Sequence, residues 1–172
     1  MLQRPKAGEF PPYYESYIQL VPEGEIILIL EESLTKTVSI FQSISESKGN
    51  FRYAPEKWSI KEVLGHMTDT ERILSVRLLR IGRGDENPLP GFNENHYIKG
   101  SNYCNLPIQR IVEEFILVRK ATIALLRNMP EEAWLRKGVA NNFENTTRAL
   151  AYIIAGHELH HCQIIKERYL RG

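Results

Sequence analysis

The sequence has few cysteines, no excess of charge of either sign and no long apolar run, and each of these absences excludes a class of protein. Its 22 basic and 21 acidic residues give a formal net charge of +1, so neither nucleic acid nor an anionic membrane surface is an expected partner. No stretch has the uninterrupted apolar length of a membrane span, and proline and charge interrupt the N-terminal segment where a signal peptide would be apolar. We therefore expect a cytoplasmic protein.

The two cysteines, Cys104 and Cys162, are too few for a disulfide scaffold. This low usage is typical of a reduced compartment, and the simplest interpretation of each cysteine is a small apolar residue. A catalytic thiol is the alternative for either of them, although buried cysteines are mostly inert.

The alternation of apolar and polar residues that marks strands is also absent, so the pattern indicates an all-α fold. A length of 172 residues with 42% hydrophobic content suits a single domain, which we place at 1–172. Its first part, 1–22, is rich in proline and tyrosine and is expected to be an irregular arm before the first helix.

Four segments repeat apolar residues at helical spacing and are predicted to be the long helices. The clearest start is at Ser59, which can cap the second helix while Glu62 returns the bond in a reciprocal capping box. Pro107 is pre-shaped for the start of the third helix, and Thr146 or Thr147 can cap the last. The predicted helices span about 23–47, 59–81, 106–128 and 146–169, with a short helical turn at 130–135.

The connection between the second and third helices, 84–106, is far longer than most loops between packed helices. The second helix would be about 35 Å long at 1.5 Å per residue, and a connection of this length can cross the whole bundle. The helices that it joins can therefore run parallel, which predicts a four-helix bundle with a long crossover loop. His96 within this loop has no spacing partner, and a solvated side chain is the default expectation.

Histidines one turn apart, His157 and His161, fall within the apolar stripe of the last helix. Two buried imidazoles are costly to desolvate unless each nitrogen has a partner, and a divalent metal satisfies both. His66 on the second helix is the candidate third ligand, which would leave an open position as in catalytic metal sites. The alternative is that these are ordinary core histidines, with His66 bonded to a neighbour such as Asp69.

Residues 157–161 also match the HExxH pattern of zinc proteases, in which the glutamate is the general base. The match is local only, because the nearest downstream carboxylate, Glu167, lies on a different face of the helix. Glu158 is still a candidate catalytic residue that orients an imidazole or accepts a proton from bound water, with a surface position as the alternative. His160 points away from the other pair and is expected near the edge of the bundle.

Three segments together resemble the DinB-like superfamily of four-helix-bundle metalloproteins, particularly its DinB_2 branch. They are KWSIKEVLGHMTDTERILSVRLLRI, NPLPGF and YIIAGHELHHCQIIKERY, and the likeness extends over nearly the whole chain. The resemblance implies a divalent metal, commonly nickel or zinc, bound by His66, His157 and His161. Asn93 stands where relatives often carry an acidic residue, which puts any role of that position in doubt.

Relatives in this family are similar to thiol S-transferases that use bacillithiol, mycothiol or glutathione, and others are labelled metal-dependent hydrolases. The resemblance therefore implies a metal-dependent enzyme that joins a low-molecular-weight thiol to an electrophilic small molecule. Hydrolysis of a small substrate, with Glu158 or an acidic group of the loop as base, is the alternative. A third alternative is a non-catalytic bundle that binds metal for stability or senses a ligand. The resemblance also suggests a homodimer.

Overall fold

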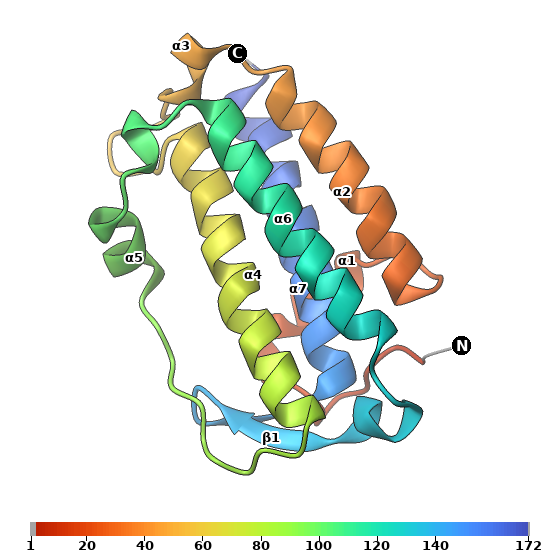
Figure 1. Ribbon diagram of the computed structural model, residues 1–172. Helices are drawn as coiled ribbons and strands as arrows, with labels where there is room; N and C mark the ends of the chain where they lie inside the picture. The colour runs from red at the N-terminus through yellow and green to blue at the C-terminus, as the bar shows by residue number, and fades with distance from the viewer. Residues whose placement is uncertain (1–2, 172) are drawn as a thin grey trace.

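Four long helices pack side by side in a computed structural model that describes residues 3–171 (Figure 1). They are α2 (Ile26–Gln42), α4 (Ile60–Gly82), α6 (Ile108–Arg127) and α7 (Thr147–Ile164). Each of α2 and α4 contacts both α6 and α7, so the four helices form a bundle around a shared interior. None of the helices within 3–171 is both long and apolar enough to cross a membrane. The predicted all-α four-helix bundle is confirmed.

The long connection crosses the bundle from end to end, so that α4 and α6 run in the same direction while α2 and α7 run in the opposite one (Figure 1). The expectation of parallel second and third helices is therefore confirmed. The connection is partly helical, with α5 (Glu94–Gly100) and a short 3-10 turn (Tyr103–Asn105). The Tyr103 hydroxyl donates to Asp69 of α4 at 2.9 Å, which fixes the end of the connection beside the bundle.

Side-chain caps mark the starts of four of the seven α-helices within residues 3–171. Ser59 and Glu62 form the predicted reciprocal capping box at the start of α4. Thr146 caps α7, since its hydroxyl accepts from the Ala149 amide at 3.2 Å. Beyond α7 the chain continues as a wider π-helical turn (Ile165–Tyr169), so the predicted end of the last helix is close to the observed one. The short predicted turn after α6 is a 3-10 helix (Glu131–Leu135).

The N-terminal part differs from the prediction in two places. The first long helix begins at Ile26 rather than near residue 23, because Gly24 takes a positive φ of 143°. It ends at Gln42, and a separate short turn, α3 (Glu46–Gly49), follows under a cap from Ser45. The arm is not irregular: it contains a 3-10 turn (Pro12–Tyr14) and the short helix α1 (Glu15–Leu20), which packs on α7.

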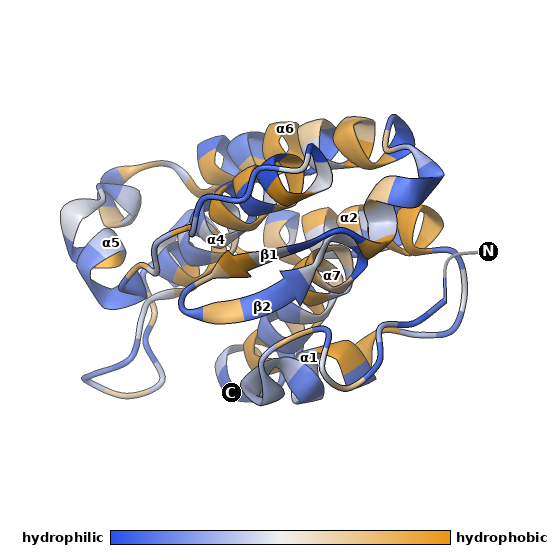
Figure 2. Ribbon diagram, turned by 90° about the horizontal axis from the view of Figure 1, so that it is seen from below, coloured by the Kyte–Doolittle hydropathy of each residue, from blue (hydrophilic) through white to orange (hydrophobic). Residues whose placement is uncertain are grey.

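A short hairpin closes one end of the bundle, as Figure 2 shows, although the sequence pattern predicts no strand. Its strands, β1 (Lys137–Ala140) and β2 (Phe143–Thr146), pair antiparallel, with Ala140 opposite Phe143. The two-residue turn between them has positive φ at both Asn141 and Asn142, the backbone of a type I′ turn, which asparagine tolerates. Four-residue strands are too short for an alternating pattern to stand out.

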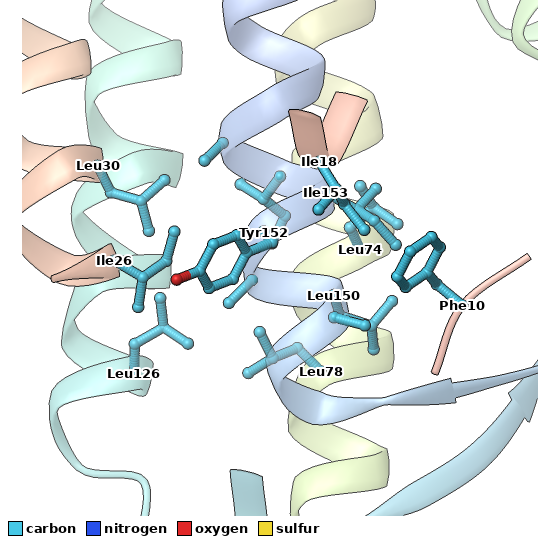
Figure 3. Packing of buried hydrophobic residues seen from close by; sticks show 14 of the residues in the cluster. Phe10, Ile18, Ile26, Leu30, Leu74, Leu78, Leu126, Leu150, Tyr152 and Ile153 are labelled. Carbon is cyan, nitrogen blue, oxygen red and sulfur yellow. The ribbon is translucent and has the colours of Figure 1, made fainter. Parts of the chain in front are cut away.

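The apolar interior is divided into two clusters along the bundle axis. Figure 3 shows part of the first, in which Tyr152 of α7 lies near Ile26 and Leu126 of the neighbouring helices. The second surrounds Phe41 and Phe115 toward the other end. Between them each long helix contributes buried polar residues, and this polar layer comprises Ser33, Thr37, His66, Thr70, Glu71, Arg119, Thr122, His157, Glu158 and His161.

Candidate metal centre

Three imidazoles converge within the polar layer, one from α4 and two from α7. The Nε2 atom of His157 lies 3.0 Å from that of His66 and 3.1 Å from that of His161. All three side chains are buried, with no residue more than 9% exposed. His157 and His161 are one helical turn apart, and His66 faces them because α4 packs directly against α7.

Two of the three nitrogen–nitrogen distances, 3.0 and 3.1 Å, match ligands that share one divalent ion, and all three ligand atoms lie within 4.8 Å of one another. Metal–nitrogen bonds of about 2.1 Å at angles between about 90° and 109° separate two ligand atoms by about 3.0–3.4 Å. A hydrogen-bonded arrangement satisfies the three nitrogens poorly, because one shared proton serves only a single pair. No other three His, Cys, Asp or Glu side chains converge in this way among residues 3–171. The residues therefore fit a three-imidazole site for a divalent metal ion.

Burial keeps these imidazoles neutral. Desolvation lowers the pKa of His66 to about 4, and it lowers the pKa of His157 and His161 well below the ordinary value of 6.5. The neighbouring imidazoles add to the effect on His157 and His161, since adjacent cations would repel one another. Unprotonated nitrogens are the form that binds a metal, so the site needs no deprotonation step at neutral pH.

Aromatic side chains and a hydroxyl hold the imidazoles in place. The Trp58 ring lies against His66, with centroids 4.6 Å apart, and Thr70 Oγ1 lies 3.4 Å from the other ring nitrogen of His66. Tyr17 of α1 meets His157 edge-on at 5.7 Å between centroids. The same ring also contacts His160, the half-buried histidine beside the site, at 5.0 Å. The helix of the N-terminal arm is thus part of the wall of the site.

Two cavities border the imidazoles. One, of about 400 Å³, is lined by His66 and His157 together with residues of α1, α4 and the hairpin turn. The other, of about 240 Å³, is lined by His161 with Trp58 and Tyr169. We call them the large cavity and the small cavity. Glu94, the first residue of α5, lines both.

Glu158 has a different environment from the one expected for a general base. One carboxylate oxygen accepts from Arg119 Nη1 and Ser33 Oγ, both at 2.6 Å, and the other accepts from Thr37 Oγ1 at 2.7 Å. The residue is 2% exposed and lines neither cavity. This geometry does not support the predicted role as general base, because the carboxylate is held by a guanidinium and two hydroxyls and reaches neither cavity. The surface alternative does not fit either.

The crossover segment brings Glu94 to the site instead. Nothing in the spacing of the sequence distinguishes it, since it follows a loop and belongs to a helix of seven residues. The nearest signal is Asn93, which caps α5 by accepting from the amide of His96 at 3.0 Å. His96 itself is exposed on α5, as expected. The position of Glu94 at the site therefore follows only from the path of the crossover segment in the structure.

Neither cysteine has the environment of a catalytic nucleophile. Burial raises the pKa of the Cys162 thiol to about 11, and the Thr37 hydroxyl lies 3.1 Å from its sulfur. Burial and the adjacent carboxylate of Glu62 also raise the pKa of Cys104. Both thiols stay protonated at neutral pH, which supports the interpretation of both as small structural side chains.

Comparison with known protein families identifies the family to which this chain belongs. The family model described as the DinB superfamily, DinB_2, matches residues 29–165. The chain belongs to the DinB superfamily. This DinB-superfamily chain matches no curated protein in a sequence comparison.

Solved structures share the fold at low sequence identity. One is YfiT from Bacillus subtilis, described as "a probable metal-dependent hydrolase with an unusual four-helix bundle topology". It is 17% identical, with a TM-score of 0.76 over 98% of this chain and 93% of its own. A mycothiol-dependent maleylpyruvate isomerase is 11% identical, with a TM-score of 0.69, and the match covers 84% of this chain and 61% of that one. At these identities the similarity shows the fold alone.

Proposed function

We propose that this protein is a divalent-metal enzyme that transfers a low-molecular-weight thiol to an electrophilic small molecule. The observation that carries the proposal is the convergence of three buried, neutral imidazole nitrogens where two separate cavities end. Two cavities that border one centre can hold two substrates at the same time. The names of the structural neighbours, a metal-dependent hydrolase and a thiol-dependent isomerase, support metal and thiol chemistry.

His66, His157 and His161 would hold the metal, with nickel or zinc suited to three nitrogen ligands. A divalent ion there would lower the pKa of a coordinated thiol or water and so supply a nucleophile at neutral pH. Since the imidazoles carry no charge, they leave the full positive charge of the ion for that purpose. Trp58 packs against His66 and Tyr17 packs against His157.

The runner-up is metal-dependent hydrolysis of a small substrate. Glu94 favours it, because this carboxylate lines both cavities beside the imidazoles and is a candidate proton acceptor. In this candidate reaction the general base is Glu94 and not Glu158. The third candidate, a bundle that binds metal only for stability, is favoured by the position of the site midway between the two apolar clusters.

Metal analysis of the purified protein is the first test. Wild type is expected to contain close to one equivalent of a divalent metal, and His161→Ala is expected to lose most of it while the circular dichroism spectrum stays helical. His96→Ala, which removes an exposed histidine of α5, is the matched control and should keep its metal. A wild-type protein that binds no divalent ion would refute the proposal.

The thiol dependence of turnover separates the two enzymatic candidates. Metal-loaded protein is assayed against a panel of electrophiles with bacillithiol, mycothiol or glutathione, and without any thiol. Product that forms only with one of the thiols supports transfer, and Glu94→Gln then keeps most of the activity. Product that forms equally without thiol, and that falls sharply in Glu94→Gln, supports hydrolysis and contradicts transfer.

The proposal includes a homodimer in the cytoplasm. Balanced charge and the low cysteine content suit a reduced compartment, and the family resemblance suggests the dimer. Light scattering of the metal-loaded protein is expected to give twice the 19.9 kDa mass of the chain. A monomer across the micromolar range would contradict this part of the proposal and leave the chemistry unaffected.

A further inference from the structure

Arg77 of α4 is a buried arginine that has no carboxylate partner among residues 3–171. It is 5% exposed, and its one hydrogen bond within residues 3–171 runs from Nη2 to the carbonyl oxygen of Pro90 at 2.7 Å. The other buried arginines, Arg119 and Arg148, each form ion pairs with glutamate. In the part of the chain that the structure describes, Arg77 has no acidic oxygen within 4.0 Å.

A guanidinium stays charged at physiological pH, and burying it without a counter-charge is unfavourable. One carbonyl oxygen uses only part of its five N–H donors. The remaining donors are not sealed inside the protein, since Asn145 Oδ1 is the only fully enclosed side-chain polar atom without a partner within 3–171. They are therefore open to an anion that enters the adjoining space.

Arg77 borders two spaces, the large cavity and a more open groove of about 340 Å³ that Leu89 and Pro90 also line, and its guanidinium lies 6.0 Å from the centre of the Phe92 ring. The large cavity is the one of the two that also contains imidazoles. His66, Thr70, Leu74 and Arg77 follow one another along one face of α4 and all line it. At 1.5 Å per residue, the first and last of them are about 16 Å apart along the helix axis. Leu74 and Ile153 make the wall between the two ends apolar. The cavity thus has imidazoles at one end, an arginine toward the other, and an apolar middle.

The other polar groups of the large cavity make its two ends chemically different. Glu94 lies at the imidazole end, because it also lines the small cavity beside His161. An anionic group would be repelled there. Burial raises the pKa of Tyr14, which also lines the cavity, so its hydroxyl remains a neutral hydrogen-bond donor. The Arg77 region is the part of the cavity suited to a negative charge.

We propose that the large cavity binds an elongated small molecule with a terminal carboxylate, which pairs with Arg77 while the opposite, reactive end reaches the imidazoles. The position of the reactive end rests on the proposed metal function, but the pairing with Arg77 does not. A bidentate guanidinium–carboxylate pair in a desolvated pocket gives both affinity and orientation. Arg77 is thus a specificity-determining residue, and carboxylates of medium length with an apolar body are the substrate class.

Paired probes that differ only in charge test the proposal. Nickel-loaded wild type is titrated by calorimetry with terminal mercaptoalkanoic acids, from mercaptobutanoic to mercaptooctanoic acid, and with the matching mercaptoalkanols. The best acid is expected to bind about tenfold to hundredfold more tightly than its alcohol, as a charged hydrogen-bonded pair provides. Equal affinity of acid and alcohol at every length would overturn the proposal without any variant.

Variants of Arg77 test whether this residue causes the tighter binding of the acid than of the alcohol. Arg77→Gln keeps a donor for the Pro90 carbonyl but removes the charge, and it should bring the acid-to-alcohol ratio close to one with little change in alcohol affinity. Arg77→Lys, which keeps the charge, should retain part of the ratio, and it serves if the glutamine variant melts early. Arg83→Gln, at the exposed end of α4, changes the net charge equally and should leave the ratio unchanged. A ratio that survives in Arg77→Gln contradicts the assignment.

Octanoate and octanol, which carry no thiol, separate this inference from the metal proposal. They are titrated into protein stripped of metal by a chelator. If octanoate still binds more tightly than octanol, and Arg77→Gln abolishes the difference, the carboxylate site stands even where the metal proposal has failed. If neither compound distinguishes wild type from Arg77→Gln while the metal tests succeed, the metal proposal stands and the carboxylate site is refuted.

Discussion

At the scale of residues, a fully buried arginine joins the four long helices, since it also donates to Ser33 of α2. Arg119 of α6 is 0% exposed and donates through Nε and Nη2 to both oxygens of Glu71, at 2.7 and 2.8 Å, and through Nη1 to Glu158. Removing one partner of such a group leaves the others as uncompensated buried charge. The cluster sits in the same polar layer as the imidazoles, so it also positions α7 for metal binding.

Arg119→Met is therefore expected to lower the free energy of unfolding by about 3–5 kcal/mol, although methionine fills much of the same volume. Urea unfolding of the metal-free protein measures the change. Arg127→Met breaks an ion pair with Glu31 that is exposed, and it should cost no more than about 1 kcal/mol. Similar, small losses in both variants would show that the buried cluster contributes little to stability.

A second prediction at the scale of residues concerns the stability of the fold at low pH. Arg148, as a hydrogen-bond donor, holds the pKa of Glu9 at about 2, below the ordinary 4.5. Because the folded-state pKa is lowered, the ionised carboxylate stabilises the fold above about pH 4.5, and this contribution is lost as the pH falls toward 2. The hydrogen bond between Glu9 and Arg148 joins the N-terminal arm to the first turn of α7.

Glu9→Gln should accordingly lose about 1–2 kcal/mol at about pH 6, less than the full shift implies because solvent screens part of the interaction. The difference from wild type should shrink toward zero near pH 2. Chemical unfolding at a series of pH values measures it. Glu86→Gln, at an exposed position, is the control and should follow wild type throughout. A difference that stays constant with pH would contradict the assignment to Glu9.

At the scale of elements, the close approach of α1 to α7 depends on one glycine. A Cβ atom added to Gly156 would lie 2.1 Å from the backbone oxygen of Tyr17, a contact that backbone atoms cannot relieve without moving the helix. The glycine therefore lets α1 lie directly on α7, one residue before His157. This contact places the Tyr17 ring over the imidazoles.

Gly156→Ala should push α1 outward and destabilise the protein by about 1–3 kcal/mol, despite the better helix propensity of alanine. Thermal unfolding measures the loss, and limited proteolysis within residues 3–22 should accelerate. At Gly100, the end of α5, an added Cβ meets nothing within 4 Å, so Gly100→Ala is the matched control. Equal stability of wild type and Gly156→Ala would show that α1 is not held in this position.

At the scale of the whole molecule, two apolar clusters lie on either side of the polar layer, and each spans all four long helices. The bundle is therefore expected to fold without metal, and metal should add stability by mass action. At a free metal concentration of about 100 times the dissociation constant, the gain is about 2.7 kcal/mol. For a chain of this size, this corresponds to a rise in melting temperature of about 5–10 °C.

Thermal unfolding with and without a chelator measures this rise, and His157→Ala should abolish it. A chelated protein that is already unfolded at room temperature would support the structural-metal candidate instead. An identical melting temperature under both conditions would contradict metal binding at the three imidazoles.

Local patterns in the sequence were sufficient to predict most of the long helices and part of the candidate site. The helical period, the Ser59 capping box and the cap at Thr146 are signals between residues within a few positions of each other, so they can be identified without the fold. The pairing of His157 with His161 is of the same kind, because one helical turn places both on one face. The length of the crossover segment likewise sufficed to predict parallel α4 and α6.

Tertiary structure alone decided which groups meet across the bundle. Glu158 looks like a catalytic base from its neighbours in the chain, but its partners come from α2 and α6 and hold it in a buried ion pair. Glu94 has no distinctive neighbours in the sequence, yet the crossover segment brings it to both cavities that border the imidazoles. Arg77 is distinctive because, among residues 3–171, no carboxylate lies within ion-pair distance of it. The physical reason is the same in each case: charge and hydrogen bonding in a low-dielectric interior depend on distances between helices, and the spacing of residues along one helix does not determine those distances.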